Sequence, residues 1–121
     1  MRISDAESLV MEALWRESPL TAEDIAAAVG PEQNWSDKTV KTLLNRLLTK
    51  KAISAAPDGR RYLYSPVVPR ADYVQDESRS LIDRLFDGKL APLVSHFAEN
   101  RKLTKRDVRE LRRLLDELDH D

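Results

Sequence analysis

One predicted helix carries side chains suited to reading a polyanion. Five polar residues stand on it at positions i, i+3, i+4, i+7 and i+11 and therefore share one face: Lys38, Lys41, Thr42, Asn45 and Thr49. A lysine can donate to guanine, an asparagine amide can pair with adenine, and a threonine methyl can contact the thymine methyl. No acidic residue interrupts the stripe. The sequence therefore predicts a helix that enters the major groove of DNA.

Cations flank this stripe on both sides. Lys50 and Lys51 follow at the end of the helix, and Arg60 and Arg61 lie in a predicted turn beyond it. Such residues bind phosphates and position a protein on DNA without reading its sequence. The alternative is that these four side chains are ordinary exposed charges.

The distribution of charge along the chain favours the DNA-binding interpretation. The 121 residues carry a net charge of −1, but residues 34–70 alone carry +6, between blocks of −5 and −2. A basic block between two acidic ones creates a local field that attracts phosphates although the total is close to zero.

Three helices are predicted before the turn. Ser4, Thr21 and Ser36 are N-cap residues, and the first two are followed three residues later by an acid that completes a capping box. The first helix is expected to end near Arg16, and the second at Gly30-Pro31. The core stripe of the third is Val40, Leu43, Leu44 and Leu47.

A hairpin follows the three helices. Residues 53–56 and 61–65 have strand character and are separated by the turn residues Pro57 to Arg60. Tyr62 and Tyr64 cannot both face the core, so one of them is expected to lie toward DNA. Three helices and a hairpin with a basic tip are the order of a winged helix-turn-helix, predicted here over residues 1–69.

Residues 70–121 are predicted to form a three-helix dimerisation domain. Because of Pro92, its second helix is expected to begin no earlier than about Ala91 or to have an irregular first turn, and Thr104 caps the last helix. Three short helices make a marginal core, so a second copy should complete it. The fold class is mainly α with a small β-hairpin. Apolar residues at helical spacing form the predicted dimer interface: Leu81, Leu85, Leu93, Phe97, Val108, Leu111, Leu115 and Leu118.

An enzyme is not expected from this composition. The chain has no cysteine and only two histidines, His96 and His120, and it lacks a phosphate-cradling glycine loop. We predict no catalytic residues, no metal site and no cofactor. The sequence also contains no apolar run long enough to cross a bilayer, so we expect a cytoplasmic protein without membrane insertion. Trp15 and Trp35 are expected to pack in the core rather than to stack on bases.

Trp35-Ser36, Thr39 to Leu44 and Arg46-Leu47 together resemble the recognition-helix motif of the penicillinase and methicillin-resistance repressors, the BlaI/MecI type, with CopY-type copper repressors as relatives. The resemblance covers nearly the whole chain. It adds Ser36, Thr39 and Arg46 to the predicted DNA-binding residues. The copper-responsive branch carries a cysteine metal motif, which this chain lacks.

The resemblance implies a homodimer that binds a palindromic operator in double-stranded DNA and represses β-lactam-resistance or related stress genes. It also implies a sensor pathway that leads to inactivating proteolysis in the C-terminal domain. The family is cleaved at an Asn-Phe bond, and the matching position here reads His96-Phe97. A second departure is Lys51-Ala52, where the family often has glycine.

A winged helix that docks on protein without specific DNA binding is the alternative function. Its recognition face would be acidic or apolar, whereas the face predicted here is basic and hydroxylic.

Overall fold

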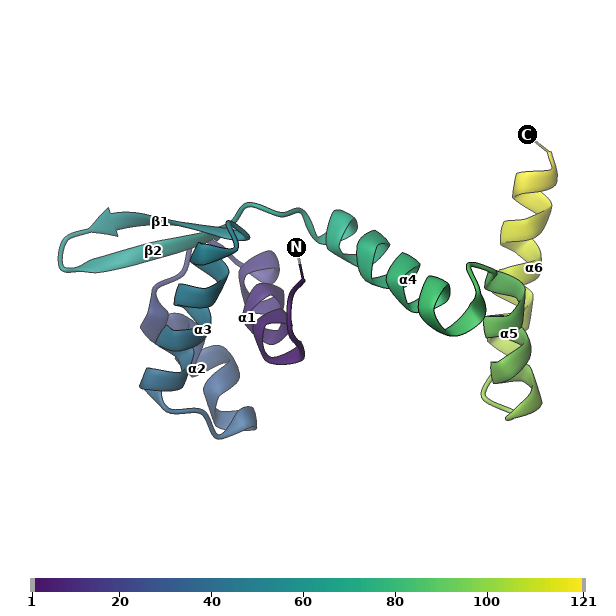
Figure 1. Cartoon of the computed structure of the whole chain (residues 1–121), viewed down its shortest axis with the longest axis horizontal. Coiled ribbons are helices and arrows are strands. Elements are labelled where there is room, and N and C mark those ends of the chain that lie inside the picture. Colours follow the sequence, from purple (N-terminus) through teal and green to yellow (C-terminus); the bar gives the residue numbers. More distant parts are fainter. Residues whose placement is uncertain (1, 121) are drawn as a thin grey trace. The chain divides into compact units, whose positions relative to one another are not determined.

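The computed structural model describes residues 2–120 and confirms a mainly helical fold with one small hairpin (Figure 1). The chain forms two compact units, the first ending at Val74 and the second beginning at Gln75. The elements follow in the order α1 (Asp5–Arg16), α2 (Ala22–Gln33), α3 (Asp37–Thr49), β1 (Ile53–Asp58), β2 (Arg61–Pro66), α4 (Arg70–Phe86), α5 (Leu90–Glu99) and α6 (Lys105–Asp119).

The three predicted helix starts in the first unit are confirmed. The Ser4 hydroxyl accepts a hydrogen bond from the Glu7 amide at 3.1 Å, while the Glu7 carboxylate accepts one from the Ser4 amide at 3.1 Å. Thr21 and Asp24 repeat this capping box at the start of α2. Each cap satisfies amides that the first helical turn leaves without a partner.

The core of the first unit lies among α1, α2 and α3. Its fully buried side chains come from all three helices and include Val10, Met11, Leu14, Ile25, Leu44 and Leu47. The predicted stripe of α3 is buried along its whole length. Because this stripe faces α1 and α2, the opposite face of α3 points outward.

Helix α2 continues beyond the predicted stop at Gly30-Pro31 and ends at Gln33. Pro31 has no amide to donate to the carbonyl four residues earlier, so α2 loses one hydrogen bond there and still continues for two more residues. The stop comes from Asn34, which has a φ of 57° in the left-handed region and donates its amide to the Gly30 carbonyl. Asparagine tolerates this conformation better than most residues.

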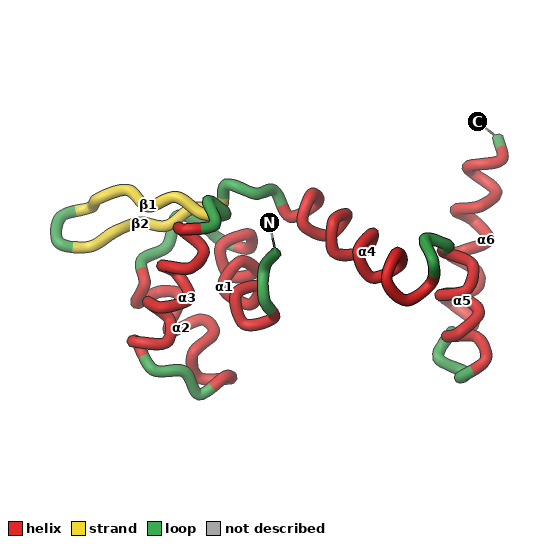
Figure 2. Tube along the Cα trace, viewed as in Figure 1, coloured by secondary structure: helices red, strands yellow, loops and turns green. Residues whose placement is uncertain are grey.

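The hairpin has a shorter turn than predicted. The strands pair antiparallel out to Pro57 opposite Tyr62 and Asp58 opposite Arg61, leaving a turn of Gly59 and Arg60 (Figure 2). Gly59 has a φ of 65°, which a two-residue hairpin turn with glycine in first position requires. Pro57 is tolerated because both strands of a two-stranded sheet are edges. We call residues 53–66 the wing.

Two backbone hydrogen bonds join the wing to the segment between α1 and α2. The Leu20 amide donates to the Tyr64 carbonyl at 3.0 Å, and the Tyr64 amide donates to the Leu20 carbonyl at 2.7 Å. Tyr64 packs against the core, whereas Tyr62 is 53% exposed near the tip. Of the two tyrosines only Tyr64 packs against the core, as predicted, and the expectation that the other lies toward DNA stays a prediction.

An indole anchor ties the start of α4 to α1 within the first unit. Trp15 donates from Nε1 to the Val68 carbonyl at 2.9 Å, and its ring lies 5.4 Å from the ring of Tyr73. Arg70 pairs with Glu12 at 3.1 Å beside it. The packing role predicted for Trp15 is confirmed.

The helices of the second unit bury very little. Among the described residues, none in α4, α5 or α6 is buried. Helix α5 begins at Leu90, close to the start predicted at about Ala91, and Pro92 is tolerated because it lies in the first turn, where an amide would have no helical partner. The Thr104 capping box of α6 is confirmed.

Replacing Trp15 by phenylalanine should lower the free energy of unfolding by at least about 1 kcal/mol, because the hydrogen bond to Val68 is lost and the smaller phenyl ring fills less of the site. Urea unfolding followed by far-ultraviolet circular dichroism measures this change. Trp35→Phe, at the other tryptophan, serves as the control. Equal stability of Trp15→Phe and the wild type would contradict the anchor.

Candidate nucleic-acid interface

The outward face of α3 presents the predicted polar stripe to solvent. Lys38, Lys41, Thr42, Asn45 and Thr49 are all exposed. The Thr42 hydroxyl donates to the Lys38 carbonyl at 2.9 Å, and the Thr49 hydroxyl donates to the Asn45 carbonyl at 3.0 Å. Each hydroxyl proton is therefore held by the helix, so these threonines offer a methyl group and an acceptor to a ligand. The donors on this face are the lysines and the Asn45 amide.

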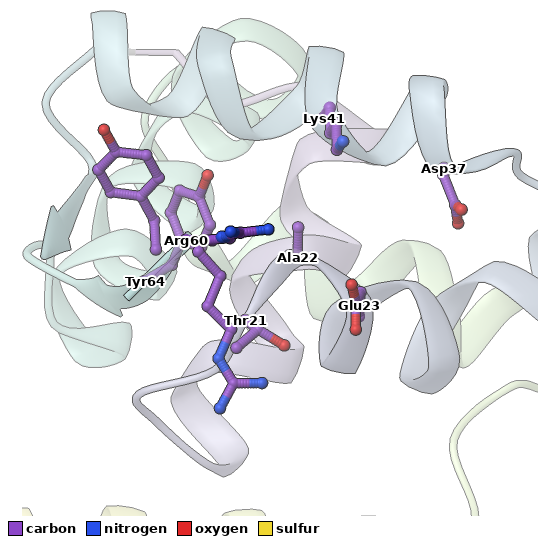
Figure 3. Close-up of a pocket in the computed structure, with 9 residues that line it drawn as sticks. Thr21, Ala22, Glu23, Asp37, Lys41, Arg60 and Tyr64 are labelled. Atoms are coloured by element: carbon purple, nitrogen blue, oxygen red, sulfur yellow. The ribbon is translucent and has the colours of Figure 1, made fainter. Parts of the chain in front are cut away.

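A hollow of about 260 Å³ lies beside α3, between the start of α2 and the wing (Figure 3). It brings Lys41 together with Arg60 and Arg61, which are far from it in the sequence. The basic tip of the wing and the middle of α3 thus border the same depression. Two exposed acids, Glu23 and Asp37, also line it, and the sequence pattern did not single them out.

The two wing arginines differ in their surroundings. Arg61 lies 3.5 Å from the Asp58 carboxylate, in a pair that is largely exposed. Its charge also contributes to lowering the pKa of Asp24, after the larger effect of the hydrogen bonds from Thr21. Arg60, by contrast, makes no ion pair with any side chain in residues 2–120. Arg60 is the wing cation best placed to meet an external anion.

Lys50, which was predicted to bind phosphate, has its ammonium group hydrogen-bonded within the chain. Its ammonium donates to the Glu7 carboxylate at 2.6 Å and to the Arg2 carbonyl at 2.7 Å. The Glu7 side chain is only 2% exposed. Lys50 therefore connects the end of α3 to the start of α1. Its ammonium group points toward Glu7 and not outward to solvent. The sequence offered no signal for this pair, because the partners are 43 residues apart.

Two opposing effects set the pKa of Glu7. Burial raises the pKa, but hydrogen bonds from Lys50 and Ser4 and the charge of Lys50 together hold it below its ordinary value. The second carboxylate oxygen of Glu7 is buried without a hydrogen-bond partner among residues 2–120. Ionised Glu7 therefore depends on Lys50 for compensation.

Lys51, which follows the C-cap of α3, has a backbone in the left-handed region, with a φ of 62°. The Ala52 amide donates to the Leu47 carbonyl and the Lys51 amide to the Leu48 carbonyl, both at 3.0 Å, as in a Schellman motif. Lysine at this position costs about 1 kcal/mol relative to glycine. In the pair Lys51-Ala52, where the sequence departs from the family, the residue with positive φ is Lys51, whose side chain is exposed.

The remaining DNA-binding residues predicted from the motif lie at two places on α3. Ser36 and Thr39 form its N-cap, where the Ser36 hydroxyl accepts from the Thr39 amide at 3.2 Å. Arg46 is exposed beside Thr42, Asn45 and Thr49, with which it lines a shallow depression. The structure thus brings Arg46 to the edge of the polar stripe.

The predicted interface and cleavage residues lie in the second unit. Leu81, Leu85, Phe97, Leu115 and Leu118 are exposed, with Leu118 at 67%, while Leu93, Val108 and Leu111 are half-buried. The His96-Phe97 bond is inside α5, and the His96 ring lies 6.4 Å from Phe86 and 5.7 Å from Phe97.

Residues 2–120 contain no group of three or more histidine, cysteine or acidic side chains arranged to hold a metal ion. No helix there has both the length and the apolar character needed to cross a membrane.

Comparison with known proteins decides the family. The family model described as penicillinase repressor matches residues 3–117. The chain belongs to the penicillinase repressor family. A penicillinase repressor of Bacillus licheniformis is 34% identical over 116 residues, which cover 96% of this chain and 91% of the relative. The methicillin resistance regulatory protein MecI of Staphylococcus aureus strain N315 is 31% identical, covering 93% of this chain and 92% of its own.

Solved structures of the family match the first unit. The DNA-binding domain of the repressor BlaI is 35% identical, with a TM-score of 0.55 over 60% of this chain and 88% of its own. Bacillus licheniformis BlaI in its monomeric form, in complex with the blaP half-operator, is 34% identical, with a TM-score of 0.53 over 60% and 89% of the two chains. The predicted winged helix and the predicted family are both confirmed.

Replacing Lys50 by methionine should destabilise the first unit by about 3 kcal/mol at neutral pH, because it leaves the buried Glu7 carboxylate uncompensated. The folded-state pKa of Glu7 is lowered, so its contribution to stability is full above the ordinary carboxyl pKa and is lost as the pH falls through the lower value. The difference in the free energy of unfolding between wild type and Lys50→Met should therefore become smaller at acidic pH. Urea unfolding over a pH series measures it.

The double variant Glu7→Gln with Lys50→Met is the matched control, since it removes both charges and should recover part of the lost stability. A constant difference at all pH values would exclude an ionised Glu7 as the cause.

Proposed function

We propose that this chain is a transcriptional repressor that binds operator DNA in a sequence-specific manner. The observation that carries the proposal is the exposed basic and hydroxylic stripe of α3, bordered by the wing cations around one hollow. The major groove admits one helix, and a wing beside it can hold the phosphate backbone. The half-operator complex of the relative with the same winged helix supports this arrangement.

The proposed roles of the side chains follow from their positions. Lys38, Lys41 and Asn45 read base edges, and the methyl groups of Thr42 and Thr49 contact thymine. Arg46, Lys51, Arg60 and Arg61 bind phosphates. Ser36 and Thr39 cap α3 and present its first amides toward a phosphate. Lys50 positions the helix through Glu7 instead of binding DNA.

We further propose that the chain acts as a homodimer through α4, α5 and α6. The support is the unburied second unit, in which Leu85, Leu115 and Leu118 are each more than half exposed. Burying one leucine contributes roughly 2 kcal/mol, so a second copy would supply the missing core. Two winged helices would then meet two half-sites of a palindromic operator.

The family supports control of β-lactam-resistance or related stress genes as the biological role. Both relatives described above are named for penicillinase or methicillin resistance. We propose a cytoplasmic location, since a repressor has to reach its operator DNA. Inactivation by proteolysis at His96-Phe97 stays a prediction that follows from the resemblance.

Titration of the purified chain with DNA from upstream of its own gene, against random competitor at two salt concentrations, tests the proposal. A retained fragment with a Kd near 10⁻⁸ M or tighter, weakening as salt rises, is expected of a specific repressor. Binding that competitor abolishes would favour the protein-docking function instead.

Asn45→Ala should weaken binding to the retained fragment by about 1 to 3 kcal/mol and leave binding to random DNA nearly unchanged, because an amide that pairs with adenine acts only at the correct base. Competition binding on the two DNAs measures both changes. Equal losses on both would remove Asn45 from base reading.

Arg60→Ala should weaken binding to both DNAs and reduce the slope of log affinity against log salt by about 1, because a phosphate contact is independent of sequence. The double variant Glu7→Gln with Lys50→Met, which removes the Lys50 charge while recovering part of the stability, is the control on the same unit. Its salt slope should equal that of the wild type if the Lys50 ammonium is held by Glu7 in the complex, and a reduced slope would return Lys50 to the phosphate contacts.

Leu115→Asp should give a monomer in sedimentation velocity, because a charge at an exposed apolar position cannot enter a dry interface. Its circular dichroism should retain the helices, and its affinity for a full operator should fall at least about a hundredfold as linkage of the two sites is lost. A stable dimer of this variant would place the interface elsewhere.

A further inference from the structure

Helix α6 carries its charges in the opposite order from the one a lone helix favours. Residues 105–113 hold five basic and two acidic side chains, whereas residues 114–119 hold three acidic side chains and no basic one. The helix dipole favours acids in the first turn and bases in the last. Only Asp107, in the capping box, follows that rule. The two halves therefore carry +3 and −3 against the dipole of the helix.

The ion pairs within α6 do little to offset this arrangement. Arg106 pairs with Glu110 at 3.1 Å and Arg113 with Glu117 at 2.7 Å, both four residues apart and with the arginine first. This order is the weaker of the two, because the better one places the acid nearer the N-terminus. All four side chains are more than half exposed, so solvent screens both pairs.

The same helix has an apolar face that nothing in the described chain covers completely. Val108 and Leu111 are half-buried, whereas Leu115 and Leu118 are 59% and 67% exposed. The four recur at spacings of three, four and three residues, which is the seam of a helix that packs on another helix. An occupant of this face must bring an apolar seam and the opposite order of charges.

We propose that this occupant is α6 of a second copy, lying antiparallel. The basic half of each helix then faces the acidic half of its partner, and the two opposed dipoles attract. In a parallel pair, the basic half of one helix would face the basic half of the other, and the two acidic halves would face each other. The inference rests on the proposed homodimer and adds the direction of its central helices.

A charge exchange in the full chain tests the direction. The exchange variant carries Lys105→Glu, Arg109→Glu, Asp116→Lys and Asp119→Lys, which keep the net charge and avoid both ion pairs described above. Native mass spectrometry of this variant mixed with ¹⁵N-labelled wild type counts homodimers and heterodimers. The control Glu99→Lys with Lys102→Glu exchanges charges outside α6 and should mix with wild type statistically.

In an antiparallel pair, the exchange variant matches itself and repels wild type. Heterodimers should therefore fall roughly fivefold below their statistical share at low salt, as expected for a few exposed like-charge contacts. They should approach that share at about 1 M salt, where the screening length is about 3 Å. Excess heterodimer would indicate a parallel pair, and statistical mixing at low salt would show that charge order is irrelevant. Either result overturns the inference.

A wild type that stays monomeric in sedimentation would instead refute the homodimer itself, so the two failures are distinguishable.

Cross-linking gives a second readout that does not depend on charge repulsion. The chain contains no cysteine, so introduced thiols are the only ones present. A mixture of Lys105→Cys and Asp119→Cys chains should form the mixed disulfide faster than either chain links to itself. Faster self-linking of both single variants would overturn the antiparallel arrangement.

Discussion

Burial of one apolar stripe determines how the first unit presents α3. Val40, Leu43, Leu44 and Leu47 are each at most 4% exposed, so the helix cannot rotate without bringing one of them into water. The polar stripe on the opposite side is therefore fixed in direction. The wing depends on the same packing, because Tyr64 at its base contacts the core formed by these residues. A rigid helix and a wing on one face make a surface that is organised before any ligand arrives.

Local signals explain why much of this arrangement could be predicted. The capping residues Ser4, Thr21 and Ser36 act on amides within three residues, and an apolar stripe at helical spacing needs no distant partner to be recognised. The two elements whose bounds were predicted wrongly, α2 and the wing turn, also depend on local effects. The end of α2 and the turn of the wing each depend on how much strain one proline costs, which varies with its place in the element.

Contacts between residues that are far apart in the chain could not be predicted from the sequence. Nothing in the pattern around Lys50 distinguishes it from Lys51, yet one is turned into the fold toward Glu7 and the other lies exposed at the end of α3. The acids Glu23 and Asp37 were missed for the same reason, because only the folded chain brings them beside Lys41. In the second unit, the seam of α6 was visible in the sequence, but the low burial of all three helices required the structure.

The left-handed conformation of Lys51 sets stability against affinity at a single position. Glycine there would relieve backbone strain and remove a cation from the end of the helix that is proposed to read DNA. A chain selected only for thermal stability would therefore drift toward glycine, while a chain selected for tight operator binding would keep lysine. At Lys51, backbone strain and a proposed phosphate contact are therefore opposed within one residue.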